Sequence, residues 1–143
     1  MSLGAGDEEG FEGRVRASFG RQRLMQTMGA RLERVEPGEV SIALPFDEGL
    51  TQQDGFLHAG VVTSIADSAC GYAAYTLMPE GSGVLSVEFK VNLLRPAEGE
   101  EFVAEAKVIK AGRTLTVTRC DVYARGAGGS KMVATMTATM IRR

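Results

Sequence analysis

The feature that most constrains the fold is an apolar stretch over residues 58–78, in which only His58 and Asp67 can carry a charge near neutral pH. Its length and its alanine content favour a helix over a strand, and a helix that is apolar on almost every side has to be buried. Asp67 and two glycines interrupt its hydropathy, which argues against a membrane span. The sequence therefore predicts a long central helix, ended by the breaker residues at 79–81.

Alternation of apolar and polar residues predicts strands on both sides of this helix. One alternating segment precedes the helix and four follow it, at 40–44, 85–93, 102–109, 114–124 and 132–140. Short turns join the last four, which predicts an antiparallel meander that curves around the helix in a two-layer α+β domain. A further helix is predicted over 11–28, because Phe11, Val15 and Phe19 are spaced by four residues.

The composition is that of an ordinary soluble protein, with 143 residues, 44% hydrophobic and 24% charged. A net charge of −2 argues against a nucleic-acid partner, which needs a basic face. Residues 1–10 are predicted to be a flexible arm without the pattern of a signal peptide, and residues 11–143 to be a single domain. Cys70 and Cys120 lack CxxC spacing, which indicates buried thiols in the reducing cytoplasm rather than a zinc site or a disulfide.

Asp67 stands out, because a carboxylate inside a buried apolar helix is costly unless it is paired or reaches water. The helix holds no Lys or Arg to pair with it. Positions on the same helical stripe carry only small residues, Gly60, Ser64, Gly71 and Ala74, which allows a close approach by a ligand or another subunit. Asp67 is therefore either a catalytic acid in a cleft or a carboxylate bonded to backbone across a dimer contact.

The start of this helix offers a second source of chemistry. Its first N–H groups lack partners within the helix, so those of Ala59 and Gly60 are candidate oxyanion donors, and Gln52 can bring a side-chain amide to the same point. His58 lies about 13 Å from Asp67 along the helix axis, so the two cannot pair within one helix. A single His at a helix start more often orients backbone than acts in catalysis. One His and two dispersed Cys cannot bind a metal.

These residues resemble the signature of the hotdog-fold acyl-CoA thioesterases, most closely that of the phenylacetic acid degradation (PaaI-like) branch. Residues 52–60 read Gln-Gln-Asp-Gly-Phe-Leu-His-Ala-Gly and are similar to the family's series of Asn or Gln, Gly and His-Gly-Gly, with Asp67 following at the family's spacing. Residues 87–97 resemble the family's strand that ends in Arg-Pro-Ala. The match covers residues 35–141, and the family's order of elements agrees with the order predicted above.

The resemblance implies a hotdog fold, a curved antiparallel sheet wrapped around one central helix, and hydrolysis of an acyl-CoA to free acid and CoA. It implies that Asp67 is the general base or nucleophile, that Ala59 gives an oxyanion-hole N–H, and that Gln52 holds the carbonyl or the attacking water. It further implies that His58 orients the loop and that Ser86 helps to position water. Ala59 replaces a Gly of the family's pattern, and its N–H stays available where the backbone is helical.

The resemblance also implies the partners. Family members are homodimers that pair into homotetramers with sites between subunits, so Asp67 and Gln52 of one site come from different chains. No metal or organic cofactor is implied, since CoA is part of the substrate. Its phosphates need cations, for which Arg113, Lys90 and Arg95 are the candidates.

Two other functions are compatible with the same fold. A non-catalytic module that binds acyl-CoA fits the replacement of Gly by Ala59, whereas the retained Asp67 speaks against it. A hydratase or dehydratase needs a His that acts with an acid on the carbons beside the thioester, but the single His lies in the thioesterase signature. The acyl group stays open, because seven Met residues give an adaptable core that fits aryl or medium-chain tails.

Overall fold

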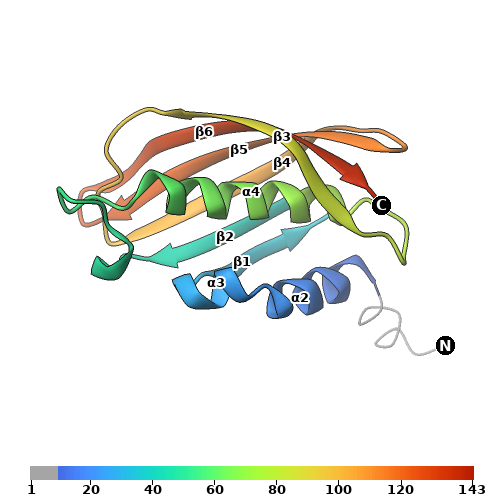
Figure 1. Cartoon of the computed structure of the whole chain (residues 1–143), viewed down its shortest axis with the longest axis horizontal. Coiled ribbons are helices and arrows are strands. Elements are labelled where there is room, and N and C mark those ends of the chain that lie inside the picture. The colour runs from blue at the N-terminus through green and yellow to red at the C-terminus, as the bar shows by residue number, and fades with distance from the viewer. Residues whose placement is uncertain (1–9) are drawn as a thin grey trace.

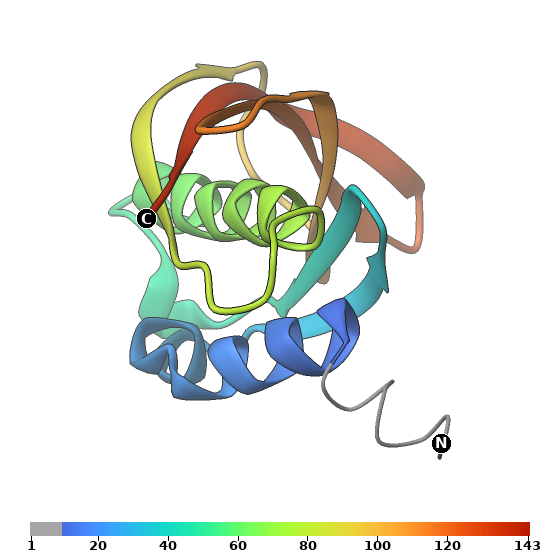
Figure 2. The same cartoon turned by 90° about the vertical axis from the view of Figure 1, so that its right-hand side faces the viewer.

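Helix α4 (Ala59–Tyr75) runs across one face of a six-stranded antiparallel sheet in the computed structural model, which describes residues 10–143 (Figure 1). The sheet curves around α4 (Figure 2). Helices α2 (Phe11–Arg21) and α3 (Arg23–Met28) lie below α4, on the side that the sheet leaves open. The predicted α+β architecture around a central helix is confirmed. The arm predicted over residues 1–10 lies, apart from Gly10, outside the described residues.

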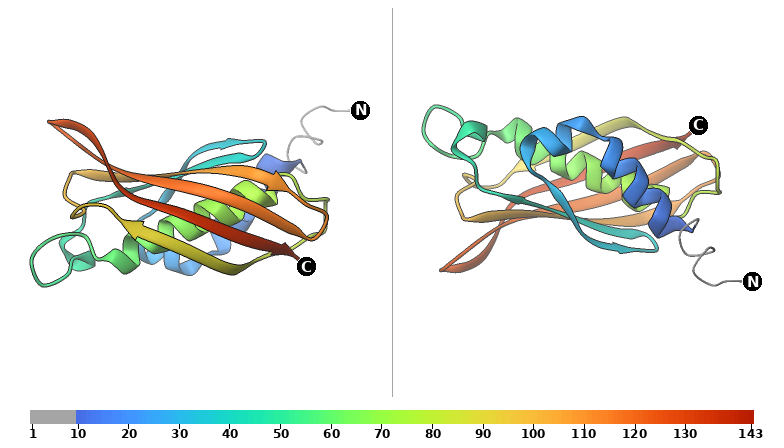
Figure 3. Two further views of the ribbon diagram at one scale, coloured as in Figure 1. Left: turned by 90° about the horizontal axis from the view of Figure 1, so that it is seen from above. Right: turned by 90° about the horizontal axis from the view of Figure 1, so that it is seen from below.

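The strand order is β1-β2-β4-β5-β6-β3, and every neighbouring pair is antiparallel. The strands are β1 (Arg31–Glu36), β2 (Glu39–Pro45), β3 (Val84–Leu93), β4 (Glu101–Ala111), β5 (Leu115–Gly126) and β6 (Gly129–Arg142). The meander predicted for the last four strands is wrong for β3, which pairs with β6 at the sheet edge and not with β4. The connection over 94–100 is too long for a tight hairpin and contains Pro96, so it carries the chain across the sheet instead (Figure 3).

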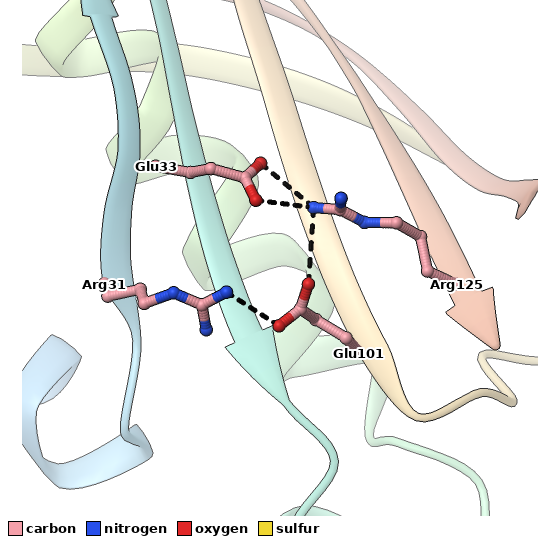
Figure 4. Close-up of polar contacts among 4 residues, drawn as sticks. All are labelled: Arg31, Glu33, Glu101 and Arg125. Carbon is pink, nitrogen blue, oxygen red and sulfur yellow. Dashed lines mark hydrogen bonds and ion pairs between the residues drawn. The ribbon is translucent and has the colours of Figure 1, made fainter.

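Strand β1 is an element that the sequence patterns do not predict. Only one of its six residues is buried, so no apolar alternation marks it. Ion pairs on the outer face of the sheet link it to β4 and β5 (Figure 4). Arg31 lies 2.8 Å from Glu101, and Arg125 lies 2.9 Å from Glu33 and 3.4 Å from Glu101. These contacts extend across β2 and help to hold the edge strand in place.

The helices differ from their predicted bounds at identifiable residues. The helix predicted over 11–28 is divided at Gln22, whose backbone is extended (φ −83°, ψ 97°). Helix α4 ends at Tyr75, where the hydroxyl of Thr76 donates to the carbonyl of Ala73 at 2.7 Å and accepts from the N–H of Gly38 at 2.8 Å. None of the helices within residues 10–143 is long and apolar enough to cross a membrane.

Strand β3 contains a β-bulge between Ser86 and Glu88, where its register with β6 shifts. Ser86 lies opposite Met140, a core residue, whereas Glu88 lies opposite Thr139 on the outer face. The simple alternation predicted over 85–93 is therefore wrong, and Ser86 shares the inner face with Phe89. A bulge inserts one residue and re-aims the side chains beside it. Here it turns the hydroxyl of Ser86 toward α4.

Candidate active site

His58 is the N-cap of α4. Its backbone is extended (φ −62°, ψ 137°), and its ring Nδ1 accepts a hydrogen bond from the N–H of Gly60 at 2.8 Å. An accepting Nδ1 means a neutral ring with its proton on Nε2. A Cβ at position 60 would lie 3.0 Å from Nδ1, so glycine leaves the room that this cap needs. His58 thus orders the helix start, and the N–H of Gly60 is committed to it.

Ala59 carries the remaining unused N–H of the first turn. Val61 and Val62 both donate to the carbonyl of His58, whereas the N–H of Ala59 has no acceptor among residues 10–143. No non-glycine residue in the described part of the chain has a positive φ, so Ala59 stands in place of the family's Gly without backbone strain. Of the two amides predicted as oxyanion donors, Ala59 is available and Gly60 is not.

Gln52 lies in the loop before α4 with its side-chain oxygen occupied. Its Oε1 accepts from the N–H groups of Asp54 at 2.6 Å and Phe56 at 3.2 Å. Two donors on one oxygen fix the orientation of the amide, and Nε2 finds no acceptor in the described residues. Nε2 of Gln52 is therefore placed to donate a hydrogen bond to a carbonyl oxygen. It cannot accept a proton from an attacking nucleophile.

Gln52 and Ala59 line one cavity of about 460 Å³ between the start of α4 and the end of β3. The lining is largely apolar, and Arg95 is the one charged residue among the described residues that form it. The other two predicted CoA cations lie elsewhere. Lys90 projects from the outer face of β3, opposite Thr137, and Arg113 lies in the β4–β5 turn near the beginning of β3. Only Arg95 is thus brought to this cavity.

Asp67 lies in the middle of α4 and forms a hydrogen bond with β3. The hydroxyl of Ser86 donates to its Oδ1 at 2.6 Å, a length typical of a charge-assisted bond. Ser86 Oγ also lies 3.4 Å from the sulfur of Met140. Asp67 is half-buried, as is Gly71 one turn later, so the carboxylate both has a hydrogen-bond partner and reaches the surface. Along the stripe of small residues, Gly60 is exposed and Ser64 is half-buried, whereas Ala74 is fully buried.

A second cavity of about 270 Å³ contains Asp67 and Ser86. Its far wall comes from the N-terminal helices and was not predicted. Gln22 accepts from the hydroxyl of Ser68 at 2.8 Å and donates to the phenol oxygen of Tyr72 at 2.9 Å. The spacing of Phe11, Val15 and Phe19 continues to either Gln22 or Arg23, so a polar residue falls at an apolar position of the predicted helix. No periodicity indicates that it reaches α4.

The two cavities place the predicted site residues in separate groups. Ala59 begins α4, next to the loop with Gln52, whereas Asp67 lies eight residues further along the helix, about 12 Å away along its axis, beside Ser86 of β3. One chain therefore presents an acid at one point and hydrogen-bond donors for an oxyanion at another. A thioester is too small to contact both groups of one chain.

The curved antiparallel sheet around α4 has the architecture of the hotdog fold. A family model described as the thioesterase superfamily matches residues 54–130, more than half of the chain. The chain belongs to this superfamily, and the predicted resemblance is confirmed. It is therefore a thioesterase-family hydrolase with the hotdog fold.

Individual proteins agree with this assignment. A thioesterase family protein from Silicibacter pomeroyi is 54% identical, with a TM-score of 0.92 over 93% of this chain and 98% of that chain. Human acyl-coenzyme A thioesterase 13 is 31% identical over 99 residues, which are 68% of this chain and 69% of the relative. The E. coli PaaI protein from the phenylacetic acid degradation operon is 18% identical, with a TM-score of 0.82 over 93% of both chains, and shows a shared fold alone.

Proposed function

We propose that the protein hydrolyses acyl-CoA thioesters to a carboxylic acid and free CoA. The observation that carries the proposal is the half-buried carboxylate of Asp67, which accepts a hydrogen bond from Ser86 and opens onto a cavity. The human relative, whose name describes an acyl-CoA thioesterase, supports the substrate class.

In the proposed mechanism Asp67 acts as the general base for water that attacks the thioester carbonyl carbon, or as the nucleophile. As nucleophile it forms an acyl-aspartyl anhydride as the thiolate leaves, and water then hydrolyses this anhydride to the free acid. Base catalysis of this kind contributes about 10²–10⁴-fold. The N–H of Ala59 and the side-chain amide of Gln52 donate to the carbonyl oxygen as its negative charge develops, and each such donor contributes roughly 3 kcal/mol. Ser86 positions the carboxylate, and His58 holds the helix start. The CoA thiolate leaves, and neither a metal nor an organic cofactor takes part.

We further propose that each site forms between two chains of a homodimer. Strand β3 is paired on one side only, and its inward residues Phe89 and Leu93 are 43% and 55% exposed. An apolar edge strand is a template for pairing with another chain. Antiparallel pairing of β3 with β3 of a second copy places the two α4 helices antiparallel. The start of one helix, with Ala59, then faces the middle of the other, with Asp67.

Mixing two inactive variants tests this arrangement. Asp67→Asn removes the acid and Gln52→Glu removes the donor, so each homodimer is expected to be inactive. Random exchange of subunits creates heterodimers with one intact site, and activity returns to about a quarter of the wild-type level. A mixture that stays inactive after demonstrated exchange contradicts a shared site. Association of two dimers into a homotetramer is part of the proposal, and sedimentation analysis measures it.

The principal test is the release of free thiol from a panel of straight-chain acyl-CoAs and aryl-acyl-CoAs, including phenylacetyl-CoA. Turnover by the wild type that falls at least a hundredfold in Asp67→Asn is expected. The matched control is Asp121→Asn on the outer face of the sheet, where Asp121 contacts Arg119 and Thr135. If the wild type binds acyl-CoA but does not turn it over, this result would contradict the proposed thioesterase activity. It would support a non-catalytic module that binds acyl-CoA.

Location and pathway complete the proposal. A reducing cytoplasm suits Cys70 and Cys120, both of which are buried free thiols. A role in phenylacetic acid degradation predicts that phenylacetyl-CoA is among the best substrates of the panel. A straight-chain preference would contradict that role and leave the thioesterase itself intact.

A further inference from the structure

The wall of the cavity beside Asp67 consists of neutral polar groups that the mechanism does not use. Gln22 bridges the hydroxyls of Ser68 and Tyr72, and Ser18 Oγ lies 3.1 Å from the phenol oxygen of Tyr72. All four residues line the same cavity as Asp67. They come from α2, from the break at Gln22 and from the side of α4 that contacts these N-terminal residues, so two separate segments of the chain build this wall.

These groups have more hydrogen-bond donors than the hydrogen bonds between them use. The three hydroxyls hold one proton each and the amide of Gln22 holds two, which gives five donors. Three hydrogen bonds join the four residues to one another, so two donors have no acceptor among residues 10–143. Lone pairs on the hydroxyl of Ser68 and on Oε1 of Gln22 are open as well. The wall can therefore both donate to and accept from a bound group.

The charges indicate which part of a substrate enters this cavity. None of the described residues that line it is cationic, and Asp67 is anionic, so the phosphates of CoA are not favoured here. The cavity with Gln52 and Ala59 has Arg95 on its lining and suits the CoA side. The acyl group then extends past Asp67 toward Gln22. A negative substituent on it would be repelled by the carboxylate, whereas a neutral hydroxyl would not.

We propose that Gln22 is a specificity-determining residue, which with Ser68 and Tyr72 recognises a neutral hydroxyl on the acyl group. The inference rests on the proposed thioesterase function and names a class of acyl group for it. Tyr72 lies five residues after Asp67, about 7.5 Å along the helix axis. A hydroxyl at the far end of a short acyl chain is therefore within reach of the wall, while the carbonyl lies at Asp67.

Three CoA thioesters of equal chain length test the proposal: hexanoyl-CoA, 6-hydroxyhexanoyl-CoA and adipoyl-CoA, whose chain ends in a carboxylate. The wild type is expected to prefer the hydroxylated substrate over hexanoyl-CoA roughly tenfold in kcat/KM, the value of one or two hydrogen bonds. Adipoyl-CoA is expected to be the poorest. Gln22→Leu presents an apolar wall, so the preference falls at least tenfold while kcat/KM for hexanoyl-CoA rises.

Two further variants separate recognition from folding. Gln26→Leu changes the same residue type on the exposed side of α3 and is expected to keep both the activity and the preference. Tyr72→Phe keeps the ring, whose centroid lies 6.0 Å from that of Phe19, and removes the hydroxyl. It is expected to lower the preference for the hydroxylated substrate, as Gln22→Leu does. The ratio between substrates is the deciding quantity, since a structural role would lower all rates alike.

The outcomes are distinguishable. Hydrolysis of hexanoyl-CoA without a preference for the hydroxylated chain overturns this inference alone, as does an equal loss on every substrate in Gln22→Leu. No hydrolysis of these thioesters or of the larger panel overturns the proposed function, and the inference with it.

Discussion

The hydroxyl of Ser86 lies 2.6 Å from Oδ1 of Asp67, although one residue is on an edge strand and the other on the central helix. The bond holds the carboxylate in one rotamer and leaves Oδ2 without a partner among the described residues. An acid held in this way is preorganised for attack or for proton transfer.

Replacement of Ser86 by Ala is expected to lower kcat ten- to hundredfold, because a hydrogen bond to a charged group contributes about 1.5–3 kcal/mol. Ser86→Thr keeps the hydroxyl and suits a strand, so it retains most of the activity. Ser130→Ala, at an exposed position near the start of β6, is the matched control. Steady-state kinetics with the best panel substrate measure the effect. An unchanged kcat in Ser86→Ala would show that Asp67 does not need this contact.

Gln52→Glu separates the two ends of the Gln52 amide. The new carboxylate still accepts from Asp54 and Phe56, so the loop keeps its conformation, but the donor toward the cavity is lost. Loss of one oxyanion donor lowers kcat by about 10²–10³-fold. The control is Gln53→Glu, at the exposed neighbouring position. Rate loss together with a changed circular dichroism spectrum would point to loop damage and contradict the separation.

Gly71→Ala is expected to stabilise the fold and to weaken the binding of bulky substrates. A Cβ at position 71 meets nothing within 4 Å in the described structure, and replacing a mid-helix Gly by Ala gains about 0.5–1 kcal/mol. The melting temperature should rise by roughly 2–4 °C. The added methyl projects into the cavity of about 270 Å³ one turn from Asp67, so KM for the bulkiest substrates rises. A lower melting temperature would mean that something outside this chain occupies the space.

Cys120 predicts how stability depends on pH. A hydrogen bond with Cys70 and burial raise the pKa of the Cys120 thiol well above its ordinary value. The unfolded chain loses this proton near pH 8.5 and the folded chain does not, so stability is full below that pH and falls above it. The expected slope is up to about 1.4 kcal/mol per pH unit. Urea unfolding between about pH 8 and 10 measures it, and Cys120→Ala, less stable at neutral pH, should lose this slope. Equal slopes in both proteins would contradict the assignment.

The sequence predicts elements best where one periodicity dominates. The stretch over 58–78 gives the central helix with an error of three residues at its end, because apolar length and alanine content agree. Strand β1 escapes prediction because its charged residues are held by ion pairs with distant positions such as Glu101 and Arg125. The place of β3 beside β6 escapes it as well, since the rule that consecutive strands pair fails across a long connection.

In the candidate site, too, the sequence predicts some features and misses others. Asp67, His58 and the loop with Gln52 stand in one short run of sequence, so spacing and chemistry identify them. Whether an N–H is free depends on local geometry, which assigns Gly60 to the ring of His58 and leaves Ala59. Gln22 meets Ser68 across 46 residues of chain, a contact that no local pattern encodes.

The β-bulge of β3 determines which face of the sheet the side chain of Ser86 occupies. Whether that hydroxyl meets the helix or the solvent depends on how many residues lie between it and the paired part of the strand, and not only on its being serine. A regular strand of the same length, without the bulge at position 87, would turn Ser86 to the outer face together with Glu88. An insertion or deletion that changes the face of Ser86 therefore acts as a chemical substitution at the carboxylate, and designers who graft or shorten this strand have to preserve that face before its composition.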